Sequence, residues 1–278
     1  MPSLDINTAV PTRTDWGEVS ERLTRALHLT APPVALTFRS PPSLDRPAYA
    51  AEPSIAAHPP ATHGASRQAG PLAPPNEHGR TGSAPAGCVF WIRGTEQAIT
   101  TTAVDHANCS VGSLTHGFRS LDEVIDNDDV QALLASGWVD PGGVTALPVV
   151  TERPESITYS PLASCTETPT VVLVRLNARG LMTVKDAVPD LPVEGKPQCH
   201  IVAIAKEQGR VAASVGCALS RARTGMRVDE ATCVFPAETL PALVGELEHH
   251  AELDSQMAHY AADDARRFTT PQPGVPEP

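Results

Sequence analysis

The chain reads GCVFWIRGTEQAITTTAVDHANCSVG at residues 87–112 and QCHIVAIAKEQGRVAASVGCALS at residues 198–220. In both stretches a cysteine opens a helical segment, a β-rich run follows, and a second cysteine stands at the exit of that strand. Twenty residues separate Cys88 from Cys109, and seventeen separate Cys199 from Cys217. We therefore expect two similar units, and stacking them in one fold would bring four thiols to one place.

The rest of the chain alternates between helical and strand patterns. Asp15 can cap a helix over 16–29, and the β-branched run at 170–176 predicts a buried strand. Residues 121–136 predict an acidic amphipathic helix, and residues 237–268 predict a long C-terminal helix. This pattern indicates an α/β or α+β fold, with a mixed sheet built from two similar Cys-helix-strand-Cys units and a long C-terminal helix.

Proline content divides the chain. Residues 41–86 hold ten of its 28 prolines and almost no large apolar side chain. Such a segment buries too little surface to offset the entropy lost on ordering. We expect a flexible arm at 1–14, one globular domain at 15–268 with a mobile insertion at 41–86, and a flexible tail at 269–278.

Composition limits the possible partners and the compartment. The formal net charge of −11 disfavours nucleic acid and anionic membranes, because both attract clustered Lys and Arg. No run of eighteen apolar residues is present, and the first thirty residues lack the apolar core of a signal peptide. We therefore expect a cytoplasmic protein with reduced thiols.

Four convergent thiols in a protein of the cytoplasm usually bind a metal. No carboxylate neighbours Cys88, Cys109, Cys199 or Cys217, which suits a soft metal. The competing interpretation is a set of scattered core cysteines, since no C-x-x-C pair is present and cysteine is often buried. Two further cysteines, Cys165 and Cys233, are interpreted as buried or incidental thiols.

Arginines and histidines flank the cysteines. Arg221, Arg223 and Arg227 follow Cys217, and we predict that Arg221 holds an anionic group of a substrate. Pairing of these arginines with the nearby carboxylates of residues 229 and 230 is the alternative. His106, with His116 and His200, could act as a ligand or proton carrier, or could be an ordinary loop histidine. The predicted substrate-binding residues are Arg221 and His106.

Several motifs together resemble the bacterial and archaeal family known as domain of unknown function 169. They are APPVA at 31–35, NCSVGS at 108–113 with THG at 115–117, KPQC at 196–199, and GCALSR at 216–221 with TG at 224–225 and DE at 229–230. The resemblance extends from about Trp16 to Tyr260. It implies cysteines at positions 88, 109, 199 and 217 and an arginine at 221. The chain departs from the family by its insertion at 41–86 and by Ala218, where glycine is usual.

These observations predict a protein that binds an iron–sulfur cluster, most simply 4Fe–4S, through the four cysteines. It would act on a small-molecule substrate or exchange electrons with a redox partner, as an oxidoreductase or lyase. The chain could also form a homodimer. The alternatives are a structural zinc tetrathiolate in a binding or regulatory protein, and a cofactor-free enzyme with a cysteine nucleophile.

Overall fold

The computed structural model describes residues 13–40, 87–137, 140–195, 197–217, 220, 221, 224 and 226–269. The predicted insertion at 41–86, nearly all of the predicted arm and tail, and Arg223 lie outside these residues. Sixteen elements follow one another along the described chain. In order they are α1 (Trp16–Ala26), β1 (Val34–Arg39), α2 (Gly87–Arg93), β2 (Ile99–Thr101), α3 (Ser110–Thr115), α4 (Asp128–Ala135), α5 (Pro141–Thr145), β3 (Ser156–Pro161), η2 (Leu162–Ser164), β4 (Val171–Asn177), α6 (Ala178–Ala187), β5 (Val193–Glu194), α7 (His200–Gln208), β6 (Ala212–Ser214), β7 (Glu230–Pro236) and α9 (Leu240–Thr269).

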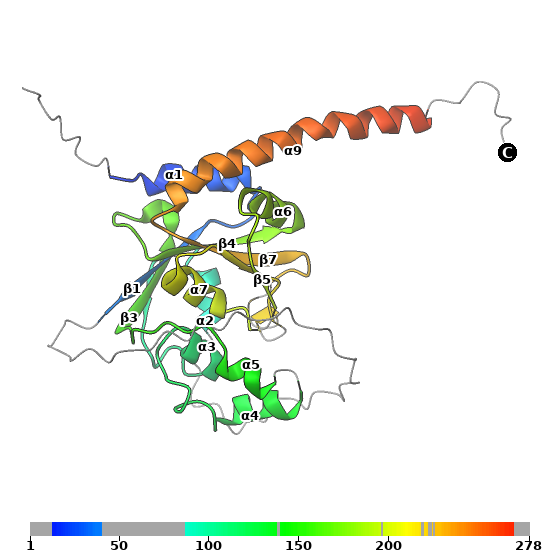
Figure 1. Ribbon diagram of the computed structural model, residues 1–278. Coiled ribbons are helices and arrows are strands. Elements are labelled where there is room, and N and C mark those ends of the chain that lie inside the picture. Colours follow the sequence, from blue (N-terminus) through cyan, green and yellow to red (C-terminus); the bar gives the residue numbers. More distant parts are fainter. Residues whose placement is uncertain are drawn as a thin grey trace, which may run out of the picture.

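One mixed sheet forms the centre of the fold. Its seven strands lie in the order β2-β3-β1-β4-β7-β6-β5, and only β5 and β6 pair in parallel. The long C-terminal helix is α9, which extends well past the sheet (Figure 1). The predicted mixed α/β fold with a long final helix is therefore confirmed.

Helices cover both faces of the sheet. Figure 1 shows α1, α6 and α9 on one side and α2, α3 and α7 on the other. Because side chains alternate along a strand, Val172 and Val174 of β4 enter the core beneath α1 and α9, whereas Val171 and Leu173 enter the core beneath α2 and α7. Burial on both faces explains why β4 reads as a continuous apolar run.

The strand order has an approximate two-fold relation. Strands β2-β3-β1 and β6-β7-β4 form two antiparallel sets, which meet where β1 pairs antiparallel with β4. Val34 pairs with Pro161 in one set and Val171 with Pro236 in the other, both at the start of their strands. The relation centres on the pair Ala35–Val172. It places β2, which lies between Cys88 and Cys109, in correspondence with β6, which lies between Cys199 and Cys217.

Side chains cap two helix starts, the first at the predicted Asp15. The Asp15 carboxylate accepts hydrogen bonds from the backbone of residues 17 and 18, and the Asn177 amide oxygen accepts one from Gly180 at 2.9 Å. The predicted helix over 121–136 is shorter, since α4 begins only at Asp128. Residues 121–127 instead form turns, in which the Glu123 carboxylate accepts a hydrogen bond from the backbone of Ser120.

Candidate functional site

Each of the four candidate cysteines stands at or near the start of a helix. Cys88 is the second residue of α2, Cys109 caps α3, and Cys199 directly precedes α7. Cys217 follows β6 and precedes a short helical turn at 220–221. No disulfide joins any of the six cysteines, all of which lie among the described residues.

Two of these sulfurs accept hydrogen bonds from the backbone in the same way. The N–H of Gly112 donates to Sγ of Cys109 at 3.4 Å, and the N–H of Ser220 donates to Sγ of Cys217 at 3.3 Å. Both bonds span three residues. The thiolate is the form of cysteine that binds metals.

The thiol of Cys199 lies near the thiols of Cys88, Cys109 and Cys217. Burial raises the pKa of the Cys199 thiol well above its ordinary value, and the neighbouring sulfurs of Cys109, Cys217 and Cys88 raise this pKa further. A hydrogen bond with Thr115 acts in the opposite direction and lowers it. Helices α3 and α7 are in contact, as are α2 and α3. The fold therefore brings the four predicted cysteines to one face of the sheet, beneath α2, α3 and α7.

The sulfurs do not, however, form a compact single-ion site. Within the described ranges, no group of three or more His, Cys, Asp or Glu side chains is close enough to hold one metal ion. A tetrahedral zinc tetrathiolate needs Zn–S distances of about 2.3 Å, and therefore sulfurs in near contact.

The two remaining cysteines lie in a different part of the core. Cys233 in β7 is buried in the cluster beneath α1 and α9, and Cys165 packs against that same cluster. Burial raises the pKa of both thiols. The sheet thus separates them from Cys88, Cys109 and Cys199, which belong to the cluster on the opposite face.

Close backbone packing joins the cysteine segments in pairs. A β-carbon at Gly87 would lie 2.7 Å from Nδ1 of His106, so the start of α2 rests on the segment that leads to Cys109. A β-carbon at Gly216 would lie 3.1 Å from Oε1 of Gln198, next to Cys199. Gly216 also has φ +90°, a left-handed conformation that favours glycine.

His106 and His116 form a buried pair beneath α2. Their ring centroids lie 5.4 Å apart, and the side chains are 0 % and 1 % exposed. Burial lowers the pKa of His106 to about 2, with a contribution from His116, and burial lowers the pKa of His116 to about 4. Both rings are therefore neutral at pH 7. The structure places His106 in a packed core with Phe90, Phe118 and Tyr159, away from any open surface.

The hydrogen bonds assign a tautomer to each ring. Thr101 donates its hydroxyl hydrogen to the carbonyl of Ile157, so it accepts from Nε2 of His106 at 3.0 Å. Nδ1 of His116 donates to the carbonyl of Gly112 at 2.8 Å. One nitrogen of each ring, Nδ1 of His106 and Nε2 of His116, is left as a buried acceptor without a hydrogen-bond partner among the described groups.

Other buried polar atoms near the cysteines also lack hydrogen bonds. In the part of the chain that the structure describes, all such side-chain atoms but one belong to six residues, namely Trp91, His106, His116, Tyr159, Gln198 and His200. Nε2 of His200 makes no hydrogen bond but lies 3.4 Å from a carboxylate oxygen of Glu194. Gln198 and His200 flank Cys199, and Trp91 follows Cys88 by about one helical turn. Buried polar side-chain atoms without a hydrogen bond are rare in native cores.

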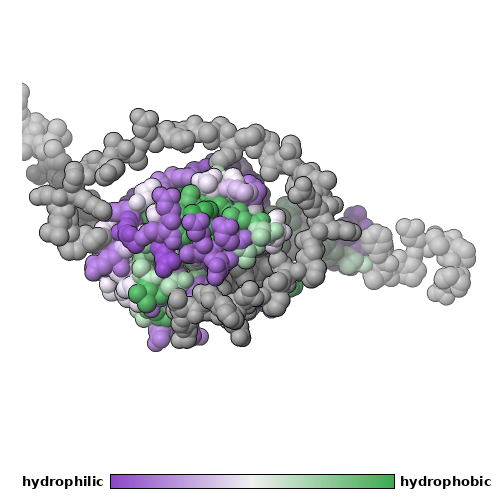
Figure 2. All heavy atoms as spheres, turned by 90° about the horizontal axis from the view of Figure 1, so that it is seen from below, coloured by the Kyte–Doolittle hydropathy of each residue, from purple (hydrophilic) through white to green (hydrophobic). Residues whose placement is uncertain are grey.

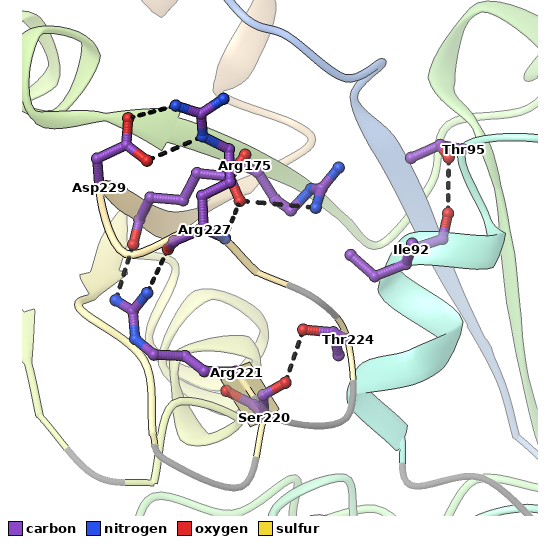
Figure 3. A network of polar contacts seen from close by, with 9 residues as sticks. Ile92, Thr95, Arg175, Ser220, Arg221, Thr224, Arg227 and Asp229 are labelled. Carbon is purple, nitrogen blue, oxygen red and sulfur yellow. Dashed lines mark hydrogen bonds and ion pairs between the residues drawn. The ribbon is translucent and has the colours of Figure 1, made fainter.

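Arg221 binds the protein itself. Its guanidinium donates to the backbone carbonyls of Val215, Arg227 and Glu230, the last at 2.9 Å. Figure 3 shows the side chain of Arg221 pointing toward the segment that carries Arg227 and Asp229. These bonds fasten the loop of Cys217 to the start of β7. Arg227 forms an exposed ion pair with Asp229, which is the pairing considered from the sequence.

A groove of about 490 Å³ lies at the other end of α3, beyond its residue Leu114. Arg119, Glu123 and Arg153 contribute its charged groups, and Arg153 pairs with Glu123 at 3.6 Å. Figure 2 views the molecule from the side of α4 and α5, where hydrophobic atoms lie exposed between hydrophilic ones. None of the four cysteines lines this groove.

Sequence reasoning missed Tyr159 and Trp91. Both read as ordinary core aromatics, and no spacing relates Tyr159 to the cysteines, because only the pairing of β3 with β2 and β1 brings them together.

No helix in the described ranges is long and apolar enough to span a membrane.

Comparison with known proteins gives one match. The sequence model of the family DUF169, described as uncharacterised ArCR, matches residues 22–246. No curated protein and no solved structure matches the chain.

Proposed function

The chain belongs to the DUF169 family, and we propose that it binds a polynuclear iron–sulfur cluster, most simply 4Fe–4S, through Cys88, Cys109, Cys199 and Cys217. The observation that carries this proposal is that three further thiols lie near Cys199, amid buried polar atoms that lack hydrogen bonds. Thiolates are the usual protein ligands of such clusters.

The spacing of the thiols favours a cluster over a single ion. The thiols of Cys88, Cys109 and Cys217 are each near enough to Cys199 to affect it electrostatically, yet no three of the four sulfurs are close enough to hold one ion. A cluster contains several metal atoms and inorganic sulfides, so its cysteine ligands stand further apart than those of a zinc ion. This geometry supports the cluster ahead of the zinc alternative.

The chemistry around the sulfurs also suits an anionic cluster. The backbone N–H groups of Gly112 and Ser220 already donate to two of the sulfurs, and such bonds stabilise negative charge on sulfur. Cys199 is only 9 % exposed, so the protein shields this side of the site from water. Arg221 acts as a positioning residue in this proposal, because it fixes the loop that carries Cys217.

Such a cluster, when bound, supplies electron transfer or, at an iron with an open position, Lewis acidity. We propose an oxidoreductase or lyase role on a small molecule in the cytoplasm. The raised pKa of Cys199 disfavours this residue as the nucleophile of a cofactor-free enzyme, since the thiolate is the reactive form.

The test is purification without oxygen, followed by a visible spectrum and assays of iron, sulfide and zinc. A brown protein with about four irons and four sulfides per chain supports the proposal. A colourless protein with one zinc per chain would overturn it in favour of the structural zinc site. A metal-free protein would overturn both and leave the reactive-thiol enzyme.

A further inference from the structure

The phenol of Tyr159 is a buried donor without an acceptor. Its side chain is 0 % exposed, and its hydroxyl has no hydrogen-bond partner among the described groups. Leaving such a group unpaired in a core is unfavourable, because it loses its hydrogen bonds to water. A buried tyrosine hydroxyl usually finds a partner, so this one indicates an atom that the protein alone does not provide.

The position of Tyr159 is tightly fixed. It lies in β3, where it pairs with Leu36 of β1 on one side and Ile99 of β2 on the other. Its ring stacks on Phe90 of α2 with centroids 5.6 Å apart, and the ring of His106 lies 6.2 Å away. The hydroxyl therefore cannot turn toward solvent to find an acceptor.

The side chain of Tyr159 lies near the thiols of Cys88 and Cys199. Burial raises the pKa of Tyr159 well above its ordinary value, and the neighbouring sulfurs of Cys88 and Cys199 raise it further. Tyr159 and Cys199 belong to the same buried cluster, against which Cys88 packs. Neither sulfur accepts its hydrogen in this structure.

We propose that Tyr159 donates its O–H to an inorganic sulfide of the bound cluster, on the side held by Cys88 and Cys199. This inference rests on the proposed function and assigns to Tyr159 the role of tuning the cluster's reduction potential. Reduction adds negative charge to the cluster, so a hydrogen bond donated to its sulfur stabilises the reduced form.

The two halves of the sheet differ at this position. Tyr159 pairs with Ile99 as Val234 pairs with Ala212, so Val234 occupies the corresponding place in the second half. Valine has no donor. The hydrogen bond therefore comes from one side of the site only, although the cysteines come from both.

The experiment is a redox titration of the iron-loaded Tyr159→Phe variant, monitored by visible absorbance and electron paramagnetic resonance. Phenylalanine keeps the ring that packs on Phe90 and removes only the hydroxyl. We expect iron and sulfide contents equal to wild type, and a roughly tenfold lower ratio of reduced to oxidised cluster at the wild-type midpoint, as for the loss of one hydrogen bond. Tyr260→Phe, on an exposed face of α9, is the matched control and should match wild type.

Two failures can be told apart. Full iron content with an unchanged midpoint in Tyr159→Phe would overturn the role of Tyr159 alone. Absence of iron and sulfide from the wild-type protein would overturn the proposed function and this inference with it. Should Tyr159→Phe misfold by circular dichroism, 3-fluorotyrosine incorporated in a Tyr49→Phe, Tyr260→Phe background gives a stronger donor at 159. The reduced fraction should then rise, and an unchanged fraction would contradict the inference.

Discussion

The side chain of Gln198 packs directly against the backbone of Gly216, where an added β-carbon would lie 3.1 Å from its Oε1 atom. These residues precede Cys199 and Cys217, so the contact holds two candidate ligands at a fixed separation. The left-handed φ of +90° at Gly216 makes the approach possible.

Replacing Gly216 with alanine should therefore disturb both the backbone and the site. We expect a loss of about 1–3 kcal/mol in the free energy of unfolding from the unfavourable φ, together with lower iron content. Gly209→Ala is the control, since Gly209 also has a positive φ, of 62°, but nothing lies within 4 Å of its added β-carbon. Denaturant titration and iron analysis measure both effects. Equal iron content in the two variants would show that the Gln198 contact does not position the ligands.

Cys109→Ser and Cys217→Ser should each lose most of the bound iron and the visible absorbance, because a serine hydroxyl is a poor ligand for a soft metal. Cys165→Ser is the matched control, since Cys165 packs on the opposite face of the sheet. We expect this control to keep its colour. Iron and colour retained in both Cys109→Ser and Cys217→Ser would contradict the assignment of these ligands.

Arg221→Lys should loosen the Cys217 loop, because an ammonium group cannot reproduce the fork that reaches three backbone carbonyls. The expected loss is about 1–3 kcal/mol in the free energy of unfolding, accompanied by faster release of iron to a chelator. Arg227→Lys, which alters an exposed pair with Asp229, should leave the stability close to that of wild type. A substrate-binding role for Arg221 would instead leave stability and iron release unchanged and raise KM.

The buried histidines should make the metal-free protein sensitive to acid. The pKa of His116 is lowered to about 4 by burial, against an ordinary value near 6.5. As the pH falls from 6.5 to 4, the unfolded chain takes up a proton that the folded protein does not. The free energy of unfolding should then fall, by about 3 kcal/mol at pH 4 from this residue alone.

His116→Gln should flatten that part of the curve, measured by urea titration between pH 7 and 4. The exposed His249→Gln is the control and should keep the wild-type slope. A wild-type slope in His116→Gln would show that the proton uptake belongs to other groups.

The local sequence predicted those helices, strands and caps that depend on residues close together in the chain. The apolar run of β4, the cap at Asp15 and the helix α9 are all where the pattern indicated. The helix expected over 121–136 was wrong in its first half, where residues 121–127 form turns and Val124 is buried. Apolar spacing alone does not distinguish such turns from a helix.

The surroundings of the candidate site depend on contacts between distant segments. Arg221 can bind three backbone carbonyls because the chain returns to it at β7. Tyr159 lies near Cys88 because β3 pairs with β2. No spacing in the sequence predicts either of these contacts. The ligand role of the four cysteines stays a prediction, and the structure adds their common location.

The approximate two-fold relation of the sheet has a consequence for the timing of assembly. Cys88 and Cys109 flank β2 in the first half of the sheet, whereas Cys199 and Cys217 flank β6 in the second. A ribosome-bound chain that ends before β6 would present only part of the ligand set. Cluster insertion would therefore follow synthesis and folding of both halves, and the loaded metal would act as a cross-link that makes them unfold together.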